Sequence, residues 1–411
     1  MNSIGADAQA ATIPALNPDV ASTLRAPEGR SRVEPVDVLR GVAMILMALD
    51  HTRDFLGATN VSPTDLARTT ALLFFTRWIT HLCAPVFFLL TGTSAYLSLR
   101  RKSTRQLSGF LLTRGLWLLF LELTLFRCLA MQFNFDYHVT VLNVLWALGW
   151  AMITLAALVH LPVPAIAAFG VFTIVGHNAL DLIQSPNPFW VLLHAQGFVV
   201  QTPHYSVVAA YPVLPWVGVT AVGYALGAIY DWTPKRRRRF LLSTGIALAA
   251  AFVVLRLVNF YGDPVRWTVR KTALLTGLSF LNTTKYPPSL LFLLMMLGPA
   301  LVLLWVFDAG TPRLLRPAAV FGKVPMFYFL LHMPLIHLIA VVVCYVRYAD
   351  VHWMFESPSI GQFPFTSPPG WGLSLPFVYL IWACVVVLLY PLCRRFGETK
   401  RRRGGLLLSY V

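Results

Sequence analysis

The first long apolar segment of the chain, VDVLRGVAMILMALDHTRDFLG at residues 36–57, carries side chains that rarely enter a membrane. A charged side chain in a membrane span costs about 2.5–3.5 kcal/mol on insertion scales, so each one is a functional candidate. A histidine among carboxylates and arginines has the groups for proton transfer and for attracting an anionic substrate. The charged or titratable residues of this segment are Asp37, Arg40, Asp50, His51, Arg53 and Asp54.

The spacing of these residues places several of them on one helix face. Arg40 and His51 are eleven residues apart, which at about 100° per residue is three turns plus about 20°. They therefore share a face and lie roughly 16 Å apart along the axis. Asp54 follows His51 by one turn, so Asp54 or Asp50 could orient the imidazole. Alternatively, Asp37 and Arg40 flank the helix start in the headgroup region, and the later residues cap its outer end.

Further polar residues lie in the later apolar segments and are secondary site candidates. For each of them the alternative is a satisfied hydrogen bond between helices. No HExxH motif and no histidine pair at i,i+4 occurs, so we predict no metal. The secondary candidates are Arg77, His81, Glu122, His177 and His332.

The composition requires a lipid environment for the elements that position these residues. Of 411 residues, 57% are hydrophobic and 12% are charged, whereas soluble proteins carry about 25% charged residues. This excludes a soluble enzyme and indicates an integral membrane protein. The net charge of +16 lies mostly in short blocks between apolar segments, at 100–102, 235–239 and 394–403. Blocks of this kind are typical of cytoplasmic loops, so we do not expect nucleic acid as a partner.

Apolar stretches of roughly 20 residues can cross a bilayer core of about 30 Å as helices. The predicted fold is an all-α transmembrane bundle with about ten spans and both termini cytoplasmic. Residues 1–35 are predicted to be a polar cytoplasmic tail, 36–398 the membrane domain and 399–411 a short basic tail. The segment 189–200 is interpreted as interfacial or re-entrant. The ten predicted spans lie near 36–57, 71–99, 107–129, 140–161, 162–183, 207–232, 238–260, 286–308, 318–347 and 374–396.

Several stretches resemble the bacterial membrane proteins that share the catalytic domain of heparan-α-glucosaminide N-acetyltransferase. An arginine, ten residues and a histidine in the first span also resemble the signature of acyltransferase-3 type enzymes. The resemblance runs from about residue 33 to the C-terminus. It is carried by VDVLRGVAMILMALDHTRDF (36–55), FFTRWITHLCAPVFFLLTGTSAYL (74–97), YPVLPWVGVTAVGYALG (211–227), TKYPPSLLFLLMMLGP (284–299), FGKVPMFYFLLHMPLIH (321–337) and LLLSYV (406–411).

The resemblance implies an enzyme that passes an acetyl group from acetyl-CoA to an amino or hydroxyl group of a sugar across the membrane. Arg40 would attract the CoA end, and His51 would deprotonate the acceptor or carry the acetyl group. Asp54 or Asp50 would hold the imidazole tautomer. In the animal enzyme of this family the histidine assigned to transfer lies in the loop after the first span. Residues 57–70 contain no histidine, so the role falls to His51 or, as second choice, His81.

The implied partners are membrane lipids, acyl-CoA and a cell-envelope sugar, in a bacterial cytoplasmic (inner) membrane. The sequence leaves open whether the chain forms a homo-oligomer. A transporter or flippase that uses the same polar stripe is the alternative function, although the matching halves that such proteins often show are not found. A third reading is a catalytically idle member that acts as a structural or binding partner.

Overall fold

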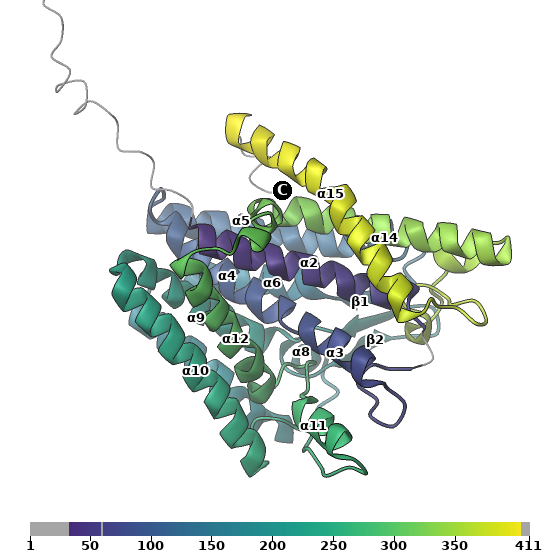
Figure 1. Ribbon diagram of the computed structural model, residues 1–411, viewed down its shortest axis with the longest axis horizontal. Coiled ribbons are helices and arrows are strands. Elements are labelled where there is room, and N and C mark those ends of the chain that lie inside the picture. Colours follow the sequence, from purple (N-terminus) through teal and green to yellow (C-terminus); the bar gives the residue numbers. More distant parts are fainter. Residues whose placement is uncertain (1–32, 59–60, 404–411) are drawn as a thin grey trace, which may run out of the picture. The chain divides into compact units, whose positions relative to one another are not determined.

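The computed structural model describes residues 33–58 and 61–403 (Figure 1). The first half of this part contains α2 (Glu34–Leu56), α3 (Ala71–Thr80), α4 (Cys83–Ser98), α5 (Thr104–Leu121), the π-helix η1 (Glu122–Met131), strand β1 (Val139–Leu142), α6 (Val144–Leu158), α7 (Val163–Gly176), the 3-10 helix η2 (His177–Leu182), α8 (Pro188–Leu193), β2 (Gly197–Gln201) and β3 (Ser206–Ala209). The second half contains α9 (Val213–Gly227), η3 (Ala228–Asp231), α10 (Pro234–Val258), α11 (Ala273–Leu281), α12 (Leu290–Ala309), η4 (Arg313–Leu315), α13 (Ala318–Lys323), α14 (Pro325–Tyr348), η5 (His352–Phe355), η6 (Ile360–Gln362) and α15 (Leu375–Arg403).

The fold confirms an all-α membrane protein with several spans. Eight helical segments in the described residues are long and apolar enough to cross a membrane. The other two predicted spans are also helical: α2 has 23 residues but a high charge, and α6 has only 15 residues. The number of ten spans therefore stays a prediction. The eight segments are Ala71–Ser98, Thr104–Met131, Val163–Leu182, Val213–Asp231, Pro234–Val258, Leu290–Ala309, Pro325–Tyr348 and Leu375–Arg403.

Helix α2 lies among the other helices and contacts α3, α4, α12, α13, α14 and α15 (Figure 1). Its charged side chains can therefore meet protein partners instead of lipid. Close backbone contact fixes α2 against α13: a Cβ atom on Gly41 would overlap the Ala318 carbonyl oxygen, and one on Gly322 would overlap the Asp37 carbonyl oxygen. Glycine is the residue that permits such an approach. This contact anchors the first half of α2.

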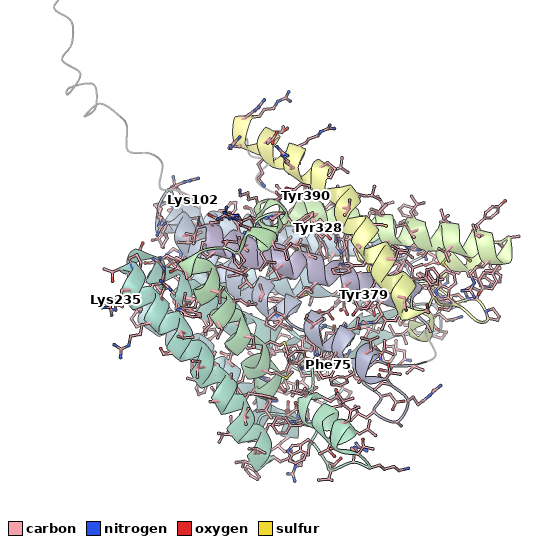
Figure 2. The ribbon with its side chains drawn as sticks, in the orientation of Figure 1. Phe75, Lys102, Lys235, Tyr328, Tyr379 and Tyr390 are labelled. Atoms are coloured by element: carbon pink, nitrogen blue, oxygen red, sulfur yellow. The ribbon has the colours of Figure 1, made fainter. Side chains whose placement is uncertain are left out.

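Basic segments gather at one end of the bundle. Arg100, which follows α4, forms an ion pair of 3.0 Å with Asp231 in η3. Figure 2 shows Lys102 and Lys235, from two of the basic blocks, on the same side of the bundle. We call this the basic end and the opposite one the distal end. The clustering agrees with the charge pattern behind the predicted orientation, and the assignment of the basic end to the cytoplasm stays a prediction.

The main difference from the expected pattern is a small sheet that shortens three of the predicted apolar segments. Strand β1 pairs in parallel with β3, and β3 pairs in antiparallel with β2. The sheet includes the first residues of the predicted spans 140–161 and 207–232. The segment 189–200 forms α8 and most of β2, and its interfacial or re-entrant position stays a prediction. All three strands contain β-branched valines, which favour a strand, but an apolar run by itself does not distinguish a strand from a helix.

The predicted tails are only partly described. Residues 1–32 of the predicted N-terminal tail and residues 404–411 of the predicted C-terminal tail lie outside the described residues, as does the LLLSYV stretch. Helix α15 continues past the predicted boundary at residue 398 to Arg403. The predicted span 162–183 is present as α7 and η2, because Pro162 and Pro164 precede and open the helix instead of interrupting it.

Candidate functional site

His51, near the distal end of α2, contacts a second histidine from a distant part of the chain. Its Nδ1 atom lies 2.7 Å from Nε2 of His332 on α14. The two rings are stacked, with centroids 5.0 Å apart and planes inclined by 19°. The Nδ1 atom of His332 lies 3.0 Å from the carbonyl oxygen of Tyr328. The two imidazoles therefore form a short hydrogen-bonded chain that ends on the backbone of α14.

This chain defines which nitrogen of each neutral imidazole carries the proton. A carbonyl oxygen only accepts, so His332 donates from Nδ1 to Tyr328 and its Nε2 has a lone pair. His51 then donates from Nδ1 to that lone pair, which leaves its own Nε2 unprotonated. The His51 Nε2 atom has no hydrogen bond to any other described residue. An oriented imidazole with an available basic nitrogen is what a general base requires.

Asp50, the residue before His51, is the centre of an ion-pair network. Its carboxylate binds the Arg53 guanidinium at 2.8 Å and the Arg77 guanidinium, from α3, at 2.5 Å. Thr80 also donates to it at 2.7 Å. Asp54 pairs with Arg53 at 2.5 Å and is 48% exposed. Neither carboxylate holds the His51 Nδ1 atom as expected, because His332 occupies that position.

A lysine that the sequence interpretation missed belongs to the same group. Lys285, in the segment between α11 and α12, is 9% exposed and interacts electrostatically with Asp50, His51 and His81. It lies in the stretch TKYPPS, just before a long apolar run. The sequence feature that could have indicated Lys285 is its position between two apolar helices. Arg53 and Arg77 pair with Asp50, and Lys285 adds a third positive charge near it without a direct ion pair to a carboxylate of the described residues.

Tyr286, next to Lys285, extends this group towards α9. Its hydroxyl lies 3.3 Å from that of Tyr211. Burial raises the pKa of Tyr286, but the neighbouring Lys285 and Arg77 cations outweigh it, so the pKa lies below the usual tyrosine value. Burial and Tyr286 both raise the pKa of Tyr211 well above its usual value. Tyr211 therefore keeps its proton over the usual pH range, and the two hydroxyl groups share one hydrogen bond.

His81, the second-choice histidine, lies in the turn between α3 and α4 and is 4% exposed. Its ring packs edge-on against Phe292, with centroids 5.4 Å apart. Its Nδ1 atom is buried and has no hydrogen-bond partner among the described residues. His81 thus adjoins the Asp50 network but is not oriented by a hydrogen bond from a second side chain as His51 is.

Arg40 lies near the basic end of α2 and joins three helices. Its guanidinium donates to Ser94 of α4 at 2.6 Å, to the Gly322 carbonyl of α13 at 2.9 Å and to Asp37 at 3.1 Å. The Arg40 side chain is 16% exposed. Its contacts are those of a residue that fixes helix positions at the end of the bundle where the basic segments gather.

Glu122 has partners that give it a structural role. Its carboxylate accepts from the backbone N–H groups of Asn143, Leu145 and Trp146 at 3.0–3.3 Å. These residues begin α6, where the first N–H groups have no partner within the helix, and the two carboxyl oxygens satisfy three of them. Glu122 therefore caps α6 from the neighbouring π-helix.

His177 lies in a different cluster. Its ring faces His194 at 5.8 Å, and His194 binds Asp181 at 2.8 Å. Of the sequence candidates, His51, Asp50, Asp54, Arg77, His81 and His332 are thus brought together, whereas Arg40, Glu122 and His177 lie elsewhere. Within the described part of the chain no group of three His, Cys, Asp or Glu side chains is placed to hold a metal ion.

Residues 32–261 match the family described as heparan-alpha-glucosaminide N-acetyltransferase, catalytic. The match covers more than half of the 411 residues. It includes His51 and the Asp50 network but ends before Lys285 and His332. No curated protein matches the chain.

Proposed function

Because the chain belongs to the heparan-alpha-glucosaminide N-acetyltransferase catalytic family, we propose that it moves an acetyl group from acetyl-CoA to an amino or hydroxyl group of a sugar across the membrane. The observation that supports this most directly is the 2.7 Å hydrogen bond between His51 and His332. It leaves a basic nitrogen on the first histidine, as acyl transfer to a weak nucleophile requires. A bacterial cytoplasmic membrane is the location that we propose.

His51 acts as the general base in this proposal. Its Nε2 atom takes the proton of the acceptor as the acceptor oxygen or nitrogen attacks the acetyl carbonyl carbon. The new C–O or C–N bond forms, the C–S bond breaks, and the proton passes from His51 to the CoA thiolate. The Nδ1 proton stays on His51 and remains hydrogen-bonded to the His332 Nε2 atom. This hydrogen bond stabilises the His51 imidazolium that forms during the reaction.

The cations around Asp50 supply the electrostatic part of the site. Arg77 and Arg53 hold the Asp50 carboxylate in place, and Lys285 adds a further positive charge. Charge develops on the carbonyl oxygen in the transition state, and a fixed cation in a water-poor site stabilises such an oxyanion. We assign this role to Lys285.

Acetyl-CoA enters at the basic end in this account. CoA carries phosphates, and basic segments attract anions over a distance of about one Debye length. Arg40 contributes its charge and holds α2, α4 and α13 in position there. The reacting acetyl group must then reach His51, roughly 16 Å further along α2, which is within the bundle.

Purified protein in lipid nanodiscs, incubated with acetyl-CoA labelled in the acetyl group, tests the function. We expect saturable binding, slow hydrolysis without a sugar, and faster loss of label when glucosamine is added, with labelled N-acetylglucosamine as product. Absence of saturable acetyl-CoA binding would contradict the proposed donor and favour the transporter alternative. Binding without hydrolysis or transfer would identify a catalytically idle member.

A further inference from the structure

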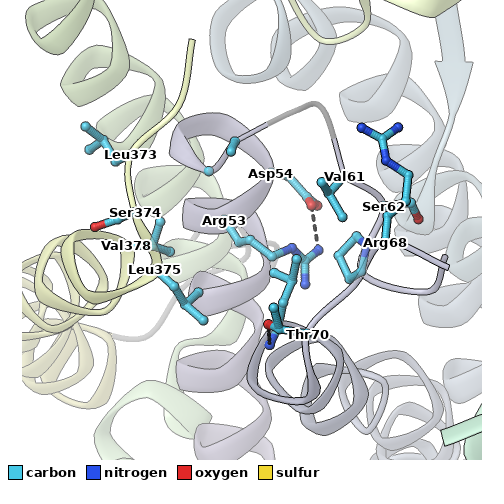
Figure 3. Close-up of a pocket in the computed structure, with 14 residues that line it drawn as sticks. Arg53, Asp54, Val61, Ser62, Arg68, Thr70, Leu373, Ser374, Leu375 and Val378 are labelled. Carbon is cyan, nitrogen blue, oxygen red and sulfur yellow. Dashed lines mark hydrogen bonds and ion pairs between the residues drawn. The ribbon is translucent and has the colours of Figure 1, made fainter. Parts of the chain in front are cut away.

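A pocket of about 430 Å³ lies at the distal end of α2 (Figure 3). It is bounded by the end of α2, by residues 61–68 of the connection to α3, by the start of α3 and by the start of α15. The proposed acetyl transfer does not use this pocket directly. It adjoins the site, because Arg53 lines the pocket and also binds Asp50, the residue next to His51.

Arg53 is a buried cation with unused hydrogen-bonding capacity. The residue is 7% exposed, and its Nη2 atom binds both Asp50 and Asp54. Its Nη1 atom is buried and has no hydrogen-bond partner among the described residues. Figure 3 shows the Arg53 guanidinium between Asp54 and Thr70. A buried charged group without a partner is costly, so this nitrogen indicates a missing acceptor.

The rest of the lining also favours a negative charge. Arg68, from the α2–α3 loop, is exposed and adds a second guanidinium, whereas Asp54 is the one carboxylate in the lining described for this pocket. The lining also includes Thr70, which caps the N-terminus of α3, and Leu375, the first residue of α15. The Thr70 hydroxyl already accepts from Leu73 N, and Phe377 N and Val378 N at the start of α15 bond to the Ser374 carbonyl, so these helix N-termini contribute mainly their partial positive charge.

The opposing end of α2 contributes little negative potential, because its last carbonyl groups are occupied. The Leu56 carbonyl accepts from Leu373 N at 2.7 Å, and the Phe55 carbonyl accepts from the Trp371 indole at 3.1 Å. The buried Arg53 and the exposed Arg68 therefore outnumber the single carboxylate, Asp54, among the described lining residues.

We propose that this pocket binds a single anionic group, a carboxylate or a phosphate, carried by the acceptor sugar. The assignment of the anion to an acceptor sugar rests on the proposed acetyl transfer. The binding of an anion rests on the pocket alone. Arg53 and Arg68 form charge-assisted hydrogen bonds to the anion, and Ser62, Thr70 and Ser374 lie in the wall where they can bind sugar hydroxyl groups. Arg53 follows His51 by two residues on α2, so the two lie about 3 Å apart along the helix axis, and an acceptor anchored at Arg53 is held at the level of His51.

Binding to the full chain in nanodiscs of neutral phosphatidylcholine tests the proposal independently of catalysis. The probes are glucuronate, glucose and inorganic phosphate, followed by thermal unfolding and by titration calorimetry. The variants are Arg68→Gln and, as a matched control, Arg270→Gln, which removes an exposed arginine outside the pocket. We expect glucuronate or phosphate, but not glucose, to bind saturably, and Arg68→Gln to weaken that binding about tenfold, which corresponds to the loss of one charge-assisted hydrogen bond. Arg270→Gln should bind like wild type.

Equal effects of the two substitutions, or equal binding of glucose and glucuronate, would overturn the anion site. Nanodiscs that contain an anionic phospholipid test whether the anion is instead a lipid headgroup. If such lipid abolishes glucuronate and phosphate binding in wild type but not in Arg68→Gln, the pocket takes a lipid headgroup, and the assignment to the acceptor is wrong. If the protein binds the anion but transfers no acetyl group, the anion site stands and the proposed function is wrong.

Discussion

The Nδ1 atom of His51 lies 2.7 Å from the Nε2 atom of His332, although 281 residues separate them in the chain. The pair joins α2, which lies in the matched family region, to α14, which lies beyond it. Because His332 donates its own proton to the Tyr328 carbonyl, the basic nitrogen of the pair is on His51.

The role of His332 is tested by His332→Phe and His332→Gln. Phenylalanine keeps a ring against Tyr328 but has no acceptor for the His51 Nδ1 proton, whereas the glutamine carbonyl restores one. We expect His332→Phe to lower the acetyl-transfer rate by about 10²-fold with unchanged acetyl-CoA affinity, and His332→Gln to recover part of it. His160→Phe, at an exposed position in the α6–α7 turn, is the control. Equal loss in both His332 variants would contradict the hydrogen-bonding role.

Arg40 is tested by comparing Arg40→Ala with Arg40→Lys. Lysine keeps the charge but cannot reproduce the guanidinium contacts to Ser94 and the Gly322 carbonyl. We expect both variants to lower the thermal unfolding midpoint by several degrees and to weaken acetyl-CoA binding about tenfold, because the helices at the basic end lose their connection. A lysine variant that behaves like wild type would show that charge alone matters.

Glu122→Gln tests whether Glu122 is structural. Glutamine retains one acceptor oxygen but replaces the other with an amide group that cannot accept, so at least one N–H group of α6 loses its partner, and we expect a loss of about 1–2 kcal/mol in stability and a lower unfolding midpoint. Acetyl transfer measured well below that midpoint should remain near the wild-type rate. Glu398→Gln, at a surface ion pair with Arg394, is the matched control. If Glu122→Gln lost acetyl transfer without losing stability, Glu122 would belong to the functional site and the structural role would be wrong.

Lys285→Met tests the electrostatic role of this lysine and has a pH-dependent readout. The lysine cation stabilises the Tyr286 phenolate and lowers its pKa, so removing the cation raises that pKa. The Tyr286 contribution to the phenolate absorbance is the difference between a protein with Tyr286 and its Tyr286→Phe variant. In the Lys285→Met protein this contribution should therefore appear at higher pH. Acetyl transfer should fall at least tenfold. Lys271→Met, at an exposed position, should change neither quantity.

Local sequence patterns were sufficient to predict the membrane fold and to select His51 and Asp50. Apolar runs of sufficient length predict spanning helices, and charged residues within a run stand out because lipid does not solvate them. The first span was selected in this way, and the family match confirms the resemblance that its residues suggested. The small sheet was missed because β1 and β3 are the first residues of apolar runs that continue as helices.

The partners of the selected residues depend on tertiary contacts, which one sequence does not contain. Helical spacing made Asp54 the nearest candidate to orient His51, whereas packing of α14 against α2 brings His332 there instead. Glu122 was chosen because it is charged within a span, but its partners are backbone N–H groups, which have no sequence signal. Lys285 lies outside the spans, so the search for charges within apolar runs missed it.

The central claim, that His51 is the base for acetyl transfer, is tested most directly by single-turnover transfer from labelled acetyl-CoA to glucosamine in wild type and His51→Ala. We predict that His51→Ala binds acetyl-CoA with wild-type affinity but transfers the acetyl group at least 10²-fold more slowly. The same measurement on His81→Ala should give a rate within a few fold of wild type. Transfer by His51→Ala at the wild-type rate, or loss of transfer only in His81→Ala, would contradict the account.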